Sequence, residues 1–94
     1  MDALMTRAIV AAMASSNASS AILIEKRRDG TDHHKVSFVI LGLAELTTRG
    51  DSYVVSPQQV AGTINLLRAT QGGNGAIPTF LIDQSTNAVS AFKL

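Results

Sequence analysis

Residues 21–43, AILIEKRRDGTDHHKVSFVILGL, decide the fold, because two apolar runs flank a charged segment with Asp29-Gly30 at its centre. Asp-Gly between apolar runs is a strong β-hairpin signal, since both residues tolerate the positive φ that a type I′ turn requires. This stretch therefore predicts two antiparallel strands joined by a two-residue turn.

The turn also predicts how the two strands pair. A two-residue turn sets Glu25 opposite His34, so that groups of complementary charge meet across the hairpin. A four-residue loop would instead set Lys26 opposite Lys35, and this like-charge pair would cost on the order of several tenths of a kcal/mol. We therefore expect the shorter turn.

The second strand of the hairpin is apolar on both of its alternating faces. Val36, Phe38 and Ile40 fall on one face, and Val39 and Leu41 fall on the other. A strand of this kind is covered on both sides. The pattern leaves two arrangements open: helices on each face of the sheet, or a second copy of the protein over one face.

A first helix is predicted over residues 2–16, which contain strong helix formers and no Gly or Pro. The basic Arg7 and the short Ala-rich run after it loosely imitate a signal peptide. The acidic Asp2 and the helical spacing of the larger apolar residues favour a structural helix instead.

A second helix is predicted to begin with Ser56 as its N-cap and Pro57 at its first position, and to end at Gly72. Gly62 inside this helix is compatible either with a close approach of a neighbouring backbone or with an incidental glycine. Arg68 falls on the face that is expected to point outward.

The remaining strands are shorter. Residues 53–55 predict a brief strand, and residues 79–82 and 88–94 predict a second hairpin. For residues 44–48 the pattern does not separate a strand from a helical turn. If the last strand lies at an edge of the sheet, it offers unpaired backbone to another chain, which is the simplest route to a dimer.

The order of these elements predicts a single α+β domain that spans residues 1–94. We expect a mainly antiparallel sheet with two helices, in the order α-β-β-(β)-α-β-β. The helices are expected to form a single layer on one face of the sheet.

Composition narrows the classes of function. Charged residues make up 16% of the chain, against a usual share of about 25%, which indicates that association hides part of the surface. A net charge of +1 does not supply the large basic face that electrostatic binding to DNA or to a membrane surface needs. No apolar run approaches the roughly 20 residues of a membrane span. We expect a cytoplasmic protein.

Catalytic and cofactor chemistry finds little support in the sequence. The absence of Cys excludes disulfides, thiolate catalysis and zinc-thiolate sites. His33 and His34 are adjacent, so on a regular strand they point to opposite faces and cannot readily share a metal ion. No Ser lies in a Gly-x-Ser-x-Gly context. We therefore expect a protein that is not an enzyme and that has no cofactor and no metal.

The leading hypothesis is a non-catalytic, self-associating module, either a protein-binding adaptor or an inhibitor. It would act through the basic tip of the hairpin or through an edge strand, as a homodimer or higher homo-oligomer with a further protein partner. The candidate binding residues at the tip are Lys26, Arg27, Arg28, His33, His34 and Lys35.

Two alternatives remain. In the first, the protein binds nucleic acid, with Lys26, Arg27, Arg28 and Lys35 on phosphates. Against it, Asp29 lies within the same segment, and no aromatic residue is interleaved there for base stacking. In the second, the protein is a ligand-binding oligomer with a pocket at the interface between subunits.

Overall fold

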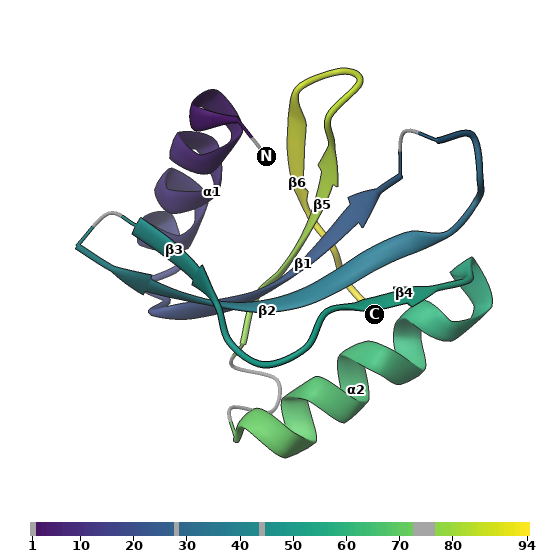
Figure 1. The fold of residues 1–94 in the computed structure, drawn as a ribbon. Coiled ribbons are helices and arrows are strands. Elements are labelled where there is room, and N and C mark those ends of the chain that lie inside the picture. Colours follow the sequence, from purple (N-terminus) through teal and green to yellow (C-terminus); the bar gives the residue numbers. More distant parts are fainter. Residues whose placement is uncertain (1, 28, 44, 73–76) are drawn as a thin grey trace.

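The computed structural model describes residues 2–27, 29–43, 45–72 and 77–94, which form one six-stranded sheet and two α-helices (Figure 1). The elements in chain order are α1 (Ala3–Ser15), β1 (Ser20–Lys26), β2 (His34–Gly42), β3 (Glu45–Thr48), β4 (Tyr53–Val55), the 3₁₀ turn η1 (Pro57–Gln59), α2 (Val60–Gln71), β5 (Thr79–Asp83) and β6 (Ala88–Ala91). The predicted α+β class and the mainly antiparallel sheet are confirmed. The undecided segment contributes a strand, β3.

The strands lie in the order β3-β2-β1-β5-β6, and β4 pairs with β2 on the same side as β3. All neighbours pair antiparallel except β1 and β5, which pair parallel. Because β1 and β5 run in the same direction, the loop after β1 and the turn after β5 project from the same end of the sheet (Figure 1). β6 lies at one edge.

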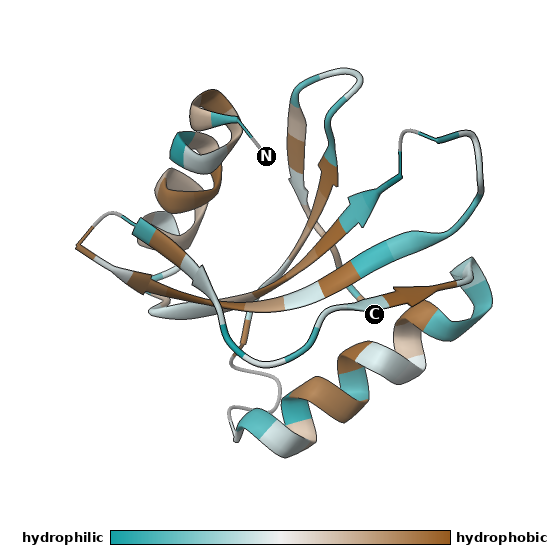
Figure 2. Cartoon of the chain, viewed as in Figure 1, coloured by the Kyte–Doolittle hydropathy of each residue, from teal (hydrophilic) through white to brown (hydrophobic). Residues whose placement is uncertain are grey.

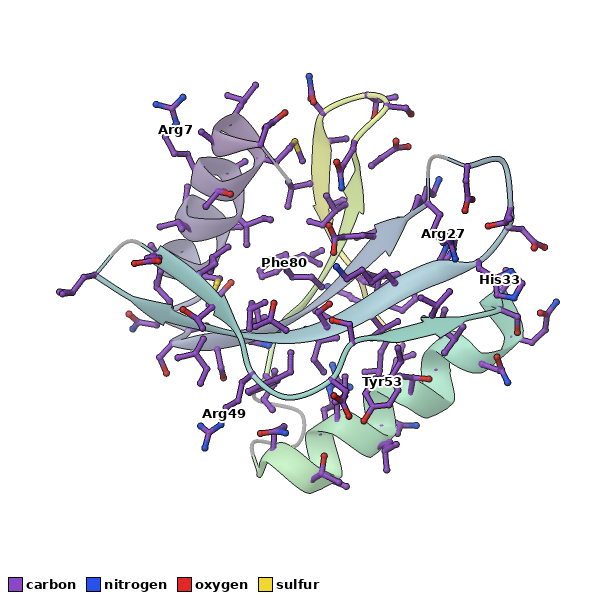
Figure 3. All side chains as sticks on the ribbon, in the orientation of Figure 1. Arg7, Arg27, His33, Arg49, Tyr53 and Phe80 are labelled. Carbon is purple, nitrogen blue, oxygen red and sulfur yellow. The ribbon has the colours of Figure 1, made fainter. Side chains whose placement is uncertain are left out.

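The two helices cover opposite faces of the sheet. On one face, Met5, Ile9 and Met13 of α1 pack in a cluster with Leu23 and Val39. Figure 3 shows Phe80, a member of the same cluster, between α1 and the strands.

The second cluster lies on the other face, where Val60, Ile64 and Leu67 of α2 pack with Ile22 and Ile24. The expected single layer of helices on one face is therefore wrong. The reason is that β1 and β2 are apolar on both faces, so that each face requires its own cover. Of the two arrangements left open above, helices on each face is the one observed.

The pairing of β1 with β2 differs by one residue from the predicted register. Glu25 lies opposite Lys35, and Lys26 lies opposite His34. A carboxylate still faces a cation across the strands, so the structure satisfies the same electrostatic preference with a different pair. Figure 2 shows the apolar centre of these strands giving way to hydrophilic residues toward the loop.

The loop chemistry explains this difference. Gly30 has a positive φ of 81°, but β1 ends at Lys26 and β2 begins at His34, so the strands are not joined by a two-residue type I′ turn. Instead the Asp29 carboxylate accepts hydrogen bonds from the backbone N–H of Thr31 at 3.1 Å and from its hydroxyl at 2.8 Å. An aspartate that bonds the backbone two residues ahead makes a turn of its own.

The helix ends follow local sequence signals. Asp2 accepts a hydrogen bond from the backbone N–H of Met5 at 2.8 Å and so caps α1. The backbone N–H of Ser56 donates to the side chain of Gln59 at 3.1 Å, at the start of the turn that leads into α2. Gly72 ends α2 with the predicted left-handed φ of 77°.

Gly62 has open space around it. A Cβ built on Gly62 would meet no atom within 4 Å beyond its own helical surroundings. Of the two interpretations of this glycine, the close approach of a neighbouring backbone is therefore not observed within the described part of the chain. In the same ranges, neither helix has the length and apolar character that crossing a membrane requires.

Candidate functional site

The charges at the hairpin tip are largely paired. Arg27 forms an ion pair with Asp29, two residues along the same loop. The Nζ atom of Lys26 lies 3.7 Å from the carboxylate of Asp83, which belongs to the end of β5. Lys26 and Arg27 thus each have an acidic partner. The predicted Arg28 lies outside the described residues.

Both carboxylates favour their ionised forms. The hydroxyl of Ser85 donates to Asp83 at 2.6 Å and lowers the pKa of that carboxyl, and Lys26 lowers it further. Hydrogen bonds from the hydroxyl and backbone N–H of Thr31 lower the pKa of Asp29 in the same way. The tip therefore carries compensated charge at neutral pH rather than a bare basic patch.

These residues surround an open depression of about 670 Å³ between the two projecting loops. Lys26, Arg27 and Gly30 line it from one loop, and Asp83 and Gln84 line it from the other. Sequence reasoning did not include the β5 end in this site. No local signal could have done so, because the parallel pairing of β1 with β5 joins segments that are far apart in the chain.

The two histidines are separated by their positions. His33 lies in the loop that precedes β2 (Figure 3), with its Nδ1 atom 3.8 Å from the carboxylate of Asp32. His34 lies on β2 opposite Lys26 and lines a small pocket of about 190 Å³ on the α2 face. Within the described ranges, no three His, Asp or Glu side chains come together where they could hold a metal ion.

Lys35 lies on the opposite face from Lys26 and His34, because neighbouring strand residues point to opposite sides. It lines a groove of about 340 Å³ on the α1 face, together with Glu25 and Glu45. The five tip residues that the structure describes thus do not form one surface.

The same groove contains the nearly buried Ser37. Its hydroxyl lies 2.9 Å from the hydroxyl of Ser52, and either atom can be the donor. The observed partner of Ser37 is thus another hydroxyl group and not a base of the kind that activates a serine nucleophile.

At the β6 edge of the sheet, alternate backbone groups have no hydrogen-bond partner within the described part of the chain. The N–H of Phe92 donates to the carbonyl of Thr79 at 2.8 Å, and the register sets Ser90 opposite Leu81. Hydrogen-bonded positions alternate along an antiparallel strand. The backbone groups of Ser90 therefore face β5, whereas those of Val89 and Ala91 point away from the sheet.

Arg68 departs from the sequence expectation. It was expected to point outward, but it is only partly exposed, and its Nη2 atom lies 3.5 Å from the carbonyl of Ile77 and 3.3 Å from the hydroxyl of Thr79. Its Nε atom is buried, with no hydrogen-bond partner in the described part of the chain. Helical spacing did not reveal this burial, because it depends on contacts with Ile77 and Thr79, which lie outside the helix.

Comparisons with protein families, with curated protein sequences and with solved structures found no significant match to this chain.

Proposed function

We propose that this protein is a non-catalytic, self-associating binding module, and that the free edge of β6 is its association surface. The observation that carries the proposal is the outward direction of the backbone groups of Val89 and Ala91. An unpaired strand edge is a ready template for another strand.

The side chains of β6 favour this use of the edge. The strand reads Ala88-Val89-Ser90-Ala91, with no charged residue and no proline. Charged side chains and prolines are the devices by which proteins protect exposed edges. The low overall share of charge in the chain agrees with a surface that association hides.

A symmetric dimer has one simple geometry at this edge. Antiparallel pairing about a two-fold axis at Ser90 sets Val89 opposite Ala91 of the second copy. By symmetry, it also sets Ala91 opposite Val89 of the second copy. Each of these pairs exchanges both of its backbone hydrogen bonds, because these are the outward-facing positions. The two Ser90 side chains then lie directly opposite each other, where Cα atoms are about 4.5 Å apart.

The hairpin tip is the weaker candidate surface. A phosphate or an acidic partner that engaged Lys26 or Arg27 would compete with Asp83 and Asp29, which already pair with these cations. This compensation also disfavours the nucleic-acid alternative, which requires uncompensated cations along a surface.

The experiment uses opposite charges at the two-fold axis. Ser90→Lys and Ser90→Glu each place like charges face to face, so each variant alone is expected to be monomeric in light scattering at micromolar concentration, where the wild type is dimeric. A mixture of the two variants is expected to recover the dimer, because the charges then attract.

Ala91→Pro gives a second test, since its N–H faces outward and its loss does not remove a bond to β5. This variant is expected to be a folded monomer by circular dichroism and light scattering. The double variant Lys26→Ala, Arg27→Ala serves as the control and is expected to remain dimeric. A monomeric wild type, or Ser90→Lys and Ser90→Glu variants that each remain dimeric alone, would overturn the proposal.

A further inference from the structure

A pocket of about 430 Å³ lies where the last turn of α2 meets the start of β5 and the residues after β6. Its lining includes Arg68 from α2, Lys93 after β6 and the apolar residues Ile77, Phe80, Phe92 and Leu94. Two cations and no acidic residue are among its described lining residues. The pocket is open, and its lining mixes polar and apolar groups. A concave surface with apolar residues and a few convergent polar groups is a candidate small-molecule site.

The guanidinium of Arg68 is poorly satisfied in this pocket. Its two observed contacts, to Ile77 and Thr79, go to neutral oxygens at 3.5 and 3.3 Å, which is long for hydrogen bonds. Its buried Nε has no acceptor in the described part of the chain. No carboxylate of the described residues comes within 4.0 Å of Arg68. The ion pairs observed among these residues all involve other side chains.

A partly buried cation without an anionic partner is costly, and an anion from solution would offset that cost. The terminal Nη groups of the guanidinium supply two N–H donors, which match the two oxygens of a carboxylate. Lys93 adds a second positive charge at the same pocket. The apolar remainder of the lining fits a hydrocarbon group rather than a second charged group.

We propose that this pocket binds a small monocarboxylate with an apolar tail. The carboxylate bonds the terminal Nη groups of Arg68, and the tail lies against Phe80, Phe92 and Leu94. This inference is independent of the association surface, because it depends on the unpaired guanidinium and not on the edge of β6.

Hexanoate is a suitable probe, and its binding is measured by calorimetry and by NMR of the Arg68 side-chain Nε–H. Wild-type protein is expected to bind hexanoate saturably, with a shift of the Nε–H resonance. Arg68→Gln is expected to weaken binding by at least about tenfold. Arg68→Lys is expected to be intermediate, because it keeps the charge and loses the paired donors.

The matched control is Arg7→Gln, which makes the same substitution at an exposed arginine of α1 that points away from the molecule (Figure 3). It lowers the net charge equally and is expected to bind hexanoate as the wild type does. Lys93→Gln removes the second, exposed cation and is expected to weaken binding less than Arg68→Gln. It also provides an independent test if Arg68→Gln does not fold.

Two further ligands test the chemical class. Hexanol lacks the carboxylate, and inorganic phosphate lacks the tail, so both are expected to bind at least about tenfold more weakly than hexanoate. The proposal is overturned if the wild type does not bind hexanoate, if either ligand binds as tightly as hexanoate, or if hexanoate leaves the Arg68 Nε–H resonance unshifted. None of these outcomes depends on whether β6 associates.

Discussion

Leu23 and Ile24 are adjacent in β1, and both are buried, but they belong to different cores on opposite faces of the sheet. Leu23 packs in the cluster that contains α1, and Ile24 packs in the cluster that contains α2. One strand therefore supports two helix layers, and each layer contributes to stability in its own right.

Removing a core side chain from either helix is expected to destabilise the protein by a similar amount. Ile9 of α1 and Ile64 of α2 are each 0% exposed. Ile9→Ala and Ile64→Ala should each lower the free energy of unfolding by about 2–5 kcal/mol in urea titrations. Because the two sites lie on opposite faces, the double variant should be additive within about 0.5 kcal/mol.

The control for these variants is Leu66→Ala on α2. The Leu66 side chain is 51% exposed, so its removal should change stability by no more than about 0.5 kcal/mol. A near-neutral Ile9→Ala would contradict a core between α1 and the sheet.

Gly62 within α2 and Gly72 directly after it are expected to respond to alanine in opposite directions. Gly62 lies inside the helix in open space, so Gly62→Ala should raise the free energy of unfolding by up to about 1 kcal/mol. Gly72 has a φ of 77°, and Gly72→Ala should lower it by about 1–2 kcal/mol because a Cβ is strained there. Thermal unfolding of both variants measures the difference, and the same sign for both would refute the assigned helix end.

Acid should weaken the contact between the two projecting loops. The hydroxyl of Ser85 lowers the pKa of Asp83 below its ordinary value of 3.8, so folding favours the ionised carboxylate. The resulting stabilisation is present above that ordinary pKa and is lost as the pH falls through the lowered folded-state pKa.

Asp83→Asn should therefore flatten the loss of stability between about pH 5 and pH 2, relative to the wild type. Ser85→Ala should flatten it partly, since the lysine contact remains. Unfolding midpoints measured across this range would show the effect. If Asp83→Asn retains the full acid dependence, another group is responsible for it.

Hydrogen exchange offers a local view of the β6 edge. The amide of Ser90 faces β5 and should be protected at every protein concentration. The amides of Val89 and Ala91 face outward and should exchange fast in the dilute monomer. Under the proposed association these two amides should become protected as concentration rises. Protection of Ala91 that does not depend on concentration would argue for cover from within the chain.

Local signals in the sequence predicted the end of α2 at Gly72, but α2 begins at Val60 and not at the predicted Pro57, because a 3₁₀ turn precedes it. Asp2, Ser56 and Gly72 act through short-range hydrogen bonds or through their own φ, which depend on few neighbours. The two apolar faces of β2 also indicated that both sides of the sheet are covered. The turn after β1 was predicted less well, because the side chain of Asp29 competes with the expected type I′ geometry.

Tertiary structure alone decided where the charged groups meet. The parallel pairing of β1 with β5 brings Asp83 beside Lys26, and it turns a basic run into a compensated one. The fold brings Ile77 and Thr79 to Arg68, whose Nε has no acceptor among the described residues. Spacing along a sequence reports which face of an element is apolar, whereas only the folded chain determines which distant residues lie opposite that face.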